Sequence, residues 1–538
     1  MAPKFAISSL SLGNCAHHQL PTKIRAAAER GYDGIEIFMP DFETFVDEVH
    51  SGGLHHELFP HGKTPADEML EVDCAKAIGA LCDSLNITIP VLQPLRGFEN
   101  FASRSSLGGG GLPAALKEAE RWVRLMPHFN TPLLLVCSNY IEPEDHPFAP
   151  FDPELSPLPT YTSNPEHQTT PPGPAPSPFY PAPMQEQLST YLDTQVEAFR
   201  ALGKIAARYG VRIGYEPLAW GTMIDNWEQV WDVVRRVGRE NVGIILDSFN
   251  FLGNQYADST VPTTFLRDSA SCSRTPIPVP GPSSPAVPTP QPHASLTKHI
   301  QPQNATHSAL LQNLALLAWT VPAHKIFLYQ LADGAPPCAP PATITSTPRA
   351  PARMTWSRAS RLFPCEYARG AWLPVTDMSL AVVEAGYPAA AHYTCSDAED
   401  AWWSIEVFNT SLTDSRPECV PEHAERGIVG LRELWSRVCA SVEEAQRQEQ
   451  VAAAPSPSPS HDSRISDDSG SGRAIVSDTD GSEEGASSPP KEPKFSVAAS
   501  LTRAATGKWT DGCVIGWSAQ CSSADVQMNP LVFNARYT

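Results

Sequence analysis

The sequence VGIILDSFN (242–250) is the strongest indication of architecture in the chain, because an unbroken apolar run ends in an aspartate. Three further stretches have the same form, namely VRIGYEPLAWG (211–221), KIFLYQLADG (325–334) and WWSIEVFN (402–409). Runs of aliphatic, β-branched and aromatic residues are typical of buried strands. At or near their C-terminal ends the runs carry Asp247, Glu216, Gln330 and Glu406. The carboxyl ends of the strands converge in a parallel α/β barrel, so we expect these side chains to face one space.

Segments with strand and helix character alternate along the chain around these runs. Strands are expected at 5–10, 34–38, 132–138, 211–216, 242–247, 325–331 and 402–408, and residues 87–98 are expected to supply the third strand together with its exit loop. Helices are expected at 21–31, 67–85, 115–126, 186–209, 226–238, 306–319, 374–387 and 421–448. Eight strand and helix pairs in this order predict an α/β fold, a (β/α)₈ TIM barrel that occupies residues 1–448.

Proline-rich stretches interrupt this pattern, and a polar region follows it. Proline accounts for 54 of the 538 residues and gathers at about 143–185, 271–304 and 334–352. Segments of such low complexity cannot bury enough apolar surface to fold, so we predict disordered inserts. The inserts follow the fourth, sixth and seventh strands and would emerge on the catalytic face. Residues 449–495 are predicted to form a disordered acidic linker, and the sequence suggests no role for the short segment 496–538.

Charge and hydropathy exclude several kinds of partner. The formal net charge is -20, whereas surfaces that bind nucleic acid are usually basic. No stretch approaches the roughly 18 consecutive apolar residues of a membrane span, and the start MAPKFAISSLSLG lacks the pattern of a secretion signal. The 12 cysteines are scattered without a CxxC pair. We therefore expect a cytoplasmic protein that binds a small molecule and neither nucleic acid nor membrane.

The four side chains at the strand ends offer only oxygen atoms as ligands. Two glutamates, an aspartate and a glutamine form a hard donor set that suits Mg²⁺ or Mn²⁺, whereas zinc prefers nitrogen and sulfur. A divalent cation would also relieve the repulsion among three carboxylates at one barrel mouth. Any one of these residues alone is more often a strand cap or the partner of an arginine. Four at equivalent strand ends favour a metal site.

Ten short motifs give the chain a resemblance to a known family. They are SSLSLG (8–13), GYDGIEIF (31–38), LQPLRGFE (92–99), YEPLAWG (215–221), LDSFN (246–250), YQLADG (329–334), PARMTWSRASRLFP (351–364), RGAWLP (369–374), SIEVFN (404–409) and PEHAERG (421–427). In this order the sequence resembles the fungal 3-dehydroshikimate dehydratases of quinate and shikimate catabolism. These are members of the larger group of xylose isomerase-like, metal-dependent TIM barrels.

The resemblance implies a ligand set and a reaction. Glu216, Asp247, Gln330 and Glu406 would bind the divalent cation, and the hydro-lyase reaction would convert 3-dehydroshikimate to protocatechuate. Asn250 stands where many members of the wider group have a histidine, three residues after the aspartate. This difference removes a possible acid or base but leaves a side chain that can hydrogen-bond substrate hydroxyls. Gln330 also stands where many members have histidine, which weakens an assignment as a zinc phosphodiesterase.

Candidates for the other roles lie in loops near the same strand ends. The substrate carries a carboxylate, which an arginine can bind through two parallel hydrogen bonds. The arginine candidates are Arg96, in the loop after the third strand, then Arg353, Arg358 and Arg361, each of which could instead be structural. Glu36 ends the second strand and would bind substrate or assist proton transfer, unless it pairs with a lysine.

Loop histidines are the candidates for the general base, because the pKa of histidine lies near the working pH. His55 and His56 follow the second strand, with His61, His17 and His18 as further candidates. Most loop histidines are simply solvated, and the sequence does not identify the base, the metal or the oligomeric state.

Two other functions remain open at this point. The first is a sugar isomerase or epimerase, since enolate chemistry at a metal-bound carbonyl serves both reactions on this barrel. The arginines of PARMTWSRASRLF (351–363) suit a carboxylated ring better than a neutral sugar. The second is a non-catalytic binding protein that recruits partners through its inserts and tail. The presence of all four oxygen ligands argues against it.

Overall fold

The computed structural model describes residues 2–51, 55–59, 66–102, 110–141, 182–257, 305–336, 352–387 and 401–453. The inserts and the tail predicted from composition lie almost entirely outside these residues. Some of the predicted boundaries shift. Helix α5 (Ala182–Ala207) begins before the end of the first predicted insert. Helix α12 (Cys419–Ala453) likewise extends past residue 448 into the predicted acidic linker.

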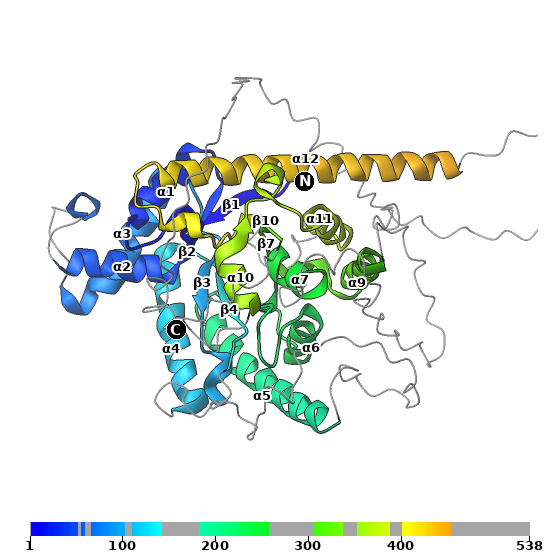
Figure 1. Cartoon of the computed structure of the whole chain (residues 1–538). Helices are drawn as coiled ribbons and strands as arrows, with labels where there is room; N and C mark the ends of the chain where they lie inside the picture. The colour runs from blue at the N-terminus through cyan, green and yellow to red at the C-terminus, as the bar shows by residue number, and fades with distance from the viewer. Residues whose placement is uncertain are drawn as a thin grey trace, which may run out of the picture.

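Eight parallel strands close into a barrel, which confirms the predicted fold (Figure 1). They are β1 (Lys4–Ser8), β2 (Gly34–Phe38), β3 (Leu92–Leu95), β4 (Leu133–Cys137), β5 (Arg212–Glu216), β6 (Val242–Asp247), β7 (Ile326–Leu331) and β10 (Trp402–Ile405). Around the barrel the order is β1-β10-β7-β6-β5-β4-β3-β2. Strand β7 therefore lies between β6 and β10, which places Gln330 between the strands that lead to Asp247 and Glu406.

Side chains that alternate along the strands fill two separate apolar layers. A small cluster contains Ala6, Val91, Leu133, Leu135, Cys137, Ile245, Phe327, Leu328 and Trp402. Its members come from strands on opposite sides of the barrel, so this cluster fills the interior below the strand ends. A much larger cluster packs the outer strand faces against the helices. Burial on both faces explains why the strands appear in the sequence as continuous apolar runs.

All eight predicted helices are present, each within a few residues of its predicted bounds. Besides α5 and α12 they are α1 (Leu20–Glu29), α3 (Leu70–Ser84), α4 (Gly111–Phe129), α6 (Trp227–Val237), α9 (Ala305–Thr320) and α11 (Val375–Glu384). Figure 1 shows α12 running along one edge of the barrel and projecting beyond it. No helix in the described ranges is both long enough and apolar enough to cross a membrane.

Within the ranges that the structure describes, three α-helices and a small antiparallel sheet were not predicted. Helices α2 (Met39–His50), α7 (Ser248–Gln255) and α10 (Ala352–Ser360) each follow a segment interpreted as a strand end or a loop. Strands β8 (Asp333–Gly334) and β9 (Arg361–Leu362) pair antiparallel after β7. The third insert was predicted from residue 334, so it begins too early. This two-stranded sheet matters because it brings Arg361 back to the mouth of the barrel.

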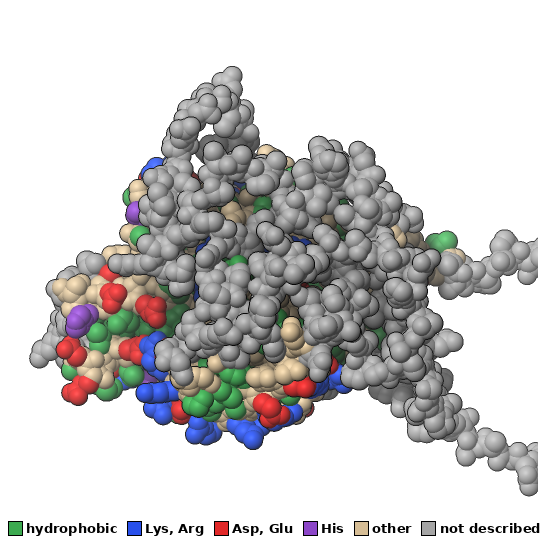
Figure 2. Space-filling view, turned by 60° about the horizontal axis from the view of Figure 1, so that its bottom comes forward, with side chains coloured by type: hydrophobic (Ala, Val, Ile, Leu, Met, Phe, Trp, Pro, Cys, Tyr) green, Lys and Arg blue, Asp and Glu red, His purple; other side chains and the backbone are tan. Residues whose placement is uncertain are grey.

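The face shown in Figure 2 carries charges of both signs on its described residues, close to one another along the lower edge. Exposed pairs on α4 to α6 include Arg124 with Glu120 and Arg235 with Asp232, at 3.2 Å and 2.9 Å. Such exposed pairs add at most about 1 kcal/mol each to stability.

Candidate metal centre and substrate pocket

Three buried carboxylates meet at the carboxyl ends of the strands. Glu216 and Asp247 are the last residues of β5 and β6, and Glu406 follows β10. Their exposed fractions are only 2%, 2% and 5%. One ligand oxygen from each lies within 4.8 Å of the other two. Ionised carboxylates this close together in a low-dielectric site repel strongly, so the cluster favours a bound cation or a bound proton.

Gln330 supplies a fourth oxygen beside this cluster. It is fully buried on β7, where its Cα pairs with that of Asp247 in the sheet register. Its Nε2 donates to Oε2 of Glu36 over 2.9 Å. Its Oε1 is buried and has no hydrogen-bond partner among the described residues. An unpaired buried oxygen is costly unless a ligand satisfies it, so these residues fit a hard divalent cation well.

Burial and mutual repulsion raise the pKa values of the glutamates in the cluster. Burial, followed by the charges of Glu406 and Asp247, raises the pKa of Glu216 well above its ordinary value. Burial raises the pKa of Glu406 to about 7, against the opposing charge of Arg361. The metal-free cluster therefore holds protons that a divalent cation would displace.

Arg361 already provides one positive charge at the carboxylates. Its Nη1 donates to Oδ2 of Asp247 over 2.8 Å and to Oε2 of Glu406 over 3.1 Å. The guanidinium is fully buried, with the rings of Phe249 and Phe408 centred 4.6 Å and 5.2 Å from its central carbon. Sequence reasoning named Arg361, together with Arg353 and Arg358, behind Arg96 as a possible carboxylate-binding residue. It did not predict its contact with the proposed ligands.

Asn250 and the start of α7 hold two of the carboxylates in place. Asp247 is the N-cap of α7, and its Oδ1 accepts from the backbone N–H of Asn250 over 2.5 Å. Nδ2 of Asn250 donates to Oε1 of Glu216 over 2.7 Å. Oδ1 of Asn250 accepts from the N–H of Ala219 over 3.2 Å. The structure thus places Asn250, predicted to bind substrate, directly against the proposed ligands.

Glu36 and Gln93 hydrogen-bond two of the proposed ligands, Gln330 and Glu406. Nε2 of Gln93 donates to Ser8 Oγ, Glu36 Oε2 and Glu406 Oε1, each over 3.0 Å. Burial, followed by the charge of Glu406, raises the pKa of Glu36 to about 8. Sequence reasoning missed Gln93, although a glutamine inside the apolar strand LQPL was a usable signal.

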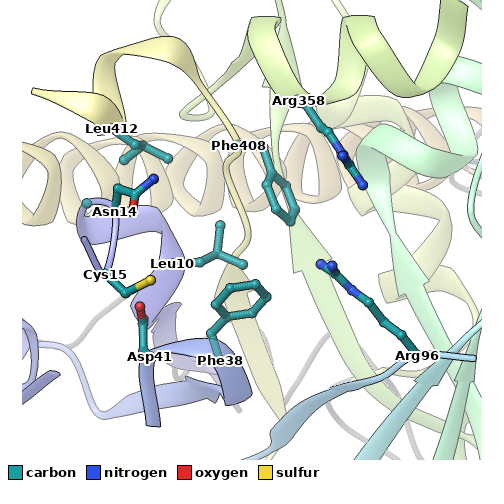
Figure 3. A pocket seen from close by; sticks show the side chains of 10 residues that line it. Leu10, Asn14, Cys15, Phe38, Asp41, Arg96, Arg358, Phe408 and Leu412 are labelled. Carbon is teal, nitrogen blue, oxygen red and sulfur yellow. The ribbon is translucent and has the colours of Figure 1, made fainter. Parts of the chain in front are cut away.

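A pocket near the carboxyl ends of β2, β3 and β10 is lined by two arginines and two aromatic rings, and also by Asp41 (Figure 3). Figure 3 shows the guanidinium groups of Arg96 and Arg358 directed toward one another from opposite sides. Burial and the charge of Arg96 lower the pKa of Arg358. Phe38 and Phe408, each two residues beyond a buried glutamate of the site, also line the pocket. Two cations that face each other across an aromatic-lined space suit an anionic ring compound.

Arg353 and His55, two further candidates from the sequence, form polar contacts with residues other than the three carboxylates. Arg353 is buried and donates to the carbonyl oxygen of Ala219 over 3.1 Å. Nε2 of His55 pairs with Glu48 of α2 over 2.8 Å rather than with the carboxylates.

The other histidines considered as general bases are His56, His61, His17 and His18. His56 begins a short 3₁₀ helix (His56–Leu58), but its side chain lies outside the described residues, as does all of His61. His17 is exposed, and Nε2 of His18 lies 2.6 Å from the carbonyl oxygen of Asp414.

Fold and site together define a class of protein, an α/β barrel whose strand ends carry buried oxygen ligands beside an arginine-lined pocket. The pattern of one such family, the xylose isomerase-like TIM barrels, matches residues 24–339 of the sequence. The chain belongs to this family.

Several known proteins are similar to the chain. The 3-dehydroshikimate dehydratase of Neurospora crassa is 29% identical over 440 residues, which are 81% of this chain and 94% of that protein. The enzyme of the same name from Pseudomonas aeruginosa is 32% identical over 233 residues, but the match spans only 25% of its length. A solved fusion protein of a xylose isomerase-like TIM barrel and a 4-hydroxyphenylpyruvate dioxygenase is 21% identical, with a TM-score of 0.45, over 85% of this chain and 45% of the fusion protein.

Proposed function

We propose that this protein converts 3-dehydroshikimate to protocatechuate with the help of a divalent cation bound by Glu216, Asp247, Gln330 and Glu406. The observation that carries the proposal is the position of an arginine pair next to a buried cluster of oxygen ligands. The similarity to the Neurospora crassa dehydratase along most of both chains supports the same reaction. A place in quinate and shikimate catabolism and a cytoplasmic location fit this activity.

The charge of the site favours a divalent ion. Three carboxylates and the one guanidinium of Arg361 sum to -3 + 1 = -2. The ligands are all oxygen, which favours Mg²⁺ or Mn²⁺. When bound there, the cation would act as a Lewis acid on the ketone oxygen and stabilise the negative charge that develops during proton loss.

The pocket residues would bind and orient the substrate ring. Arg96 and Arg358 would bind the substrate carboxylate from two sides, and Phe38 and Phe408 would cover the faces of the ring. The positive charge of Arg96 is close enough to act on Glu406. In this arrangement a bound ring would lie between the arginines and the proposed oxygen ligands. A neutral sugar would leave both guanidinium groups unpaired, which favours a carboxylated substrate over an epimerase substrate.

The experiment is a turnover assay on the purified full-length chain. With 3-dehydroshikimate and Mg²⁺ or Mn²⁺ we expect an ultraviolet absorbance increase from an aromatic product, and mass spectrometry should show the loss of one water. A chelator should abolish the signal, and re-added cation should restore it. A neutral ketose should remain unchanged. Epimerisation of the ketose without dehydration of 3-dehydroshikimate would contradict the proposal, and so would turnover in the presence of excess chelator.

A further inference from the structure

The carboxylate of Glu36 lies between the side-chain amides of Gln330 and Gln93, and both amides donate to the same carboxylate oxygen. Nε2 of Gln330 and Nε2 of Gln93 donate to Oε2 of Glu36 over 2.9 Å and 3.0 Å. Nε2 of Gln93 also donates to Oε1 of Glu406 over 3.0 Å. Glu36 is therefore the middle of a hydrogen-bond chain that joins two proposed ligands, Gln330 and Glu406, through the barrel interior.

The direction of these bonds leaves the oxygens of both amides unpaired. Oε1 of Gln330 and Oε1 of Gln93 are buried, and neither has a hydrogen-bond partner in the part of the chain that the structure describes. A side-chain amide can be turned end over end, but only its oxygen is an acceptor, because the NH₂ group offers donors alone. An acceptor placed behind the nitrogen therefore determines which end of the amide faces a cation.

We propose that Glu36 is a positioning residue that presents the oxygen of Gln330 to the cation and holds Gln93 against Glu406. The proposal rests on the metal centre of the proposed function and assigns Glu36 a role in which it touches neither cation nor substrate. This role differs from the substrate contact or proton transfer expected from the sequence. It requires an acceptor oxygen at this position, and it does not require a negative charge.

The test is the affinity of the chelator-treated full-length protein for Mn²⁺, measured by calorimetry without substrate. Glu36→Leu removes the acceptor and should weaken binding by about 10- to 100-fold, as losses behind a metal ligand do. Glu36→Met, a more flexible apolar replacement, is measured beside it in case the leucine variant does not fold. Glu36→Gln keeps an oxygen that can accept both bonds, so its affinity should stay within about threefold of the wild type.

Glu99 provides a matched control. It is also fully buried, and burial raises its pKa to about 8. Its Oε1 has no hydrogen-bond partner within the described ranges. Its other oxygen accepts from the N–H of Asn139 over 2.7 Å, away from the amide chain. Glu99→Leu should cost stability as any change to a buried glutamate does, yet leave the affinity for Mn²⁺ unchanged.

The variant Gln330→Glu distinguishes two possible roles of Glu36, namely orienting the side chain of Gln330 and merely filling the space behind it. Gln330→Glu presents oxygen whichever way the group turns, so Glu36→Leu should cost almost no further affinity in that background. An equal loss in both backgrounds would overturn the proposal, as would unchanged affinity in Glu36→Leu or a full loss in Glu36→Gln. Wild-type protein that binds no Mn²⁺ would contradict the metal centre as well. Unchanged affinity in Glu36→Leu contradicts this inference alone.

Discussion

Arg361 and Glu406 meet twice at the mouth of the barrel. Nη1 of the arginine donates both to the carbonyl oxygen and to the carboxylate Oε2 of Glu406, each over 3.1 Å. The same nitrogen reaches Asp247 over 2.8 Å. The fully buried guanidinium of Arg361 thus contacts two of the three carboxylates before any metal ion binds.

The first prediction concerns this arginine. Arg361→Leu leaves two buried carboxylates without their cation, and breaking such a buried pair costs about 3–5 kcal/mol. We expect urea denaturation of the metal-free variant to show a loss of this size in the free energy of unfolding. The control Arg437→Leu removes a half-exposed partner of Glu433 and should cost about 1 kcal/mol or less. Equal losses in the two variants would show that Arg361 does not balance the cluster.

The second prediction concerns pH. Glu406 keeps its proton to about pH 7 in the folded protein, whereas its ordinary pKa is 4.5. Between these values the unfolded chain binds fewer protons than the folded one, so rising pH lowers the stability of the metal-free protein. A cation needs the carboxylate form, so its affinity rises over the same window. The increase in Tm caused by Mn²⁺ should therefore grow between about pH 5.5 and 7.5. An increase in Tm that shrinks or stays constant would contradict this assignment.

The third prediction concerns the arginine pair. Arg96→Gln and Arg358→Gln each remove hydrogen bonds to the substrate carboxylate, and such charged hydrogen bonds contribute about 1.5–3 kcal/mol. We expect kcat/KM for 3-dehydroshikimate to fall roughly 10- to 100-fold in each variant, mainly through KM. The double variant should lose less than the sum, because both groups bind one carboxylate. The exposed Arg124→Gln serves as the control. An unchanged KM in both single variants would contradict the proposal that the two arginines bind the substrate carboxylate.

The fourth prediction concerns Asn250, which donates to Glu216 over 2.7 Å. Asn250→Ala should weaken Mn²⁺ binding by roughly tenfold or more, because the ligand loses its support. Asn254→Ala, one turn further along α7, removes a buried bond to the carbonyl oxygen of Asp225 and should leave the affinity unchanged. Calorimetry compares the two. A similar loss in both would indicate a general effect of damage to α7.

The strands and the four proposed ligands could be predicted from the sequence for one physical reason. Strands buried on both faces must be apolar throughout, so a single carboxylate or amide at the end of such a run stands out. The parallel topology then brings the ends together without any knowledge of the loops. This is why Glu216, Asp247, Gln330 and Glu406 could be chosen as a set.

The supporting residues could not be predicted in the same way. The contact between Gln93 and Glu406 joins positions 313 residues apart, and the register that allows it is not visible in a four-residue strand. Arg361 contacts the proposed ligands from a small antiparallel sheet of two-residue strands, which are too short to show a periodicity. His55 was a candidate because it follows β2 in the chain. The 12-residue helix α2 stands between them, and His55 pairs with Glu48 on that helix.

The central claim is that one divalent cation is bound jointly by Glu216, Asp247, Gln330 and Glu406. Anomalous diffraction from crystals of the full-length protein grown with Mn²⁺ tests this claim most directly. We predict a single strong anomalous peak in contact with Oε1 of Gln330 and with one oxygen of each of the three carboxylates. A peak bound elsewhere, or density with no peak at the carboxylates while Arg361 still contacts Asp247 and Glu406, would contradict the account.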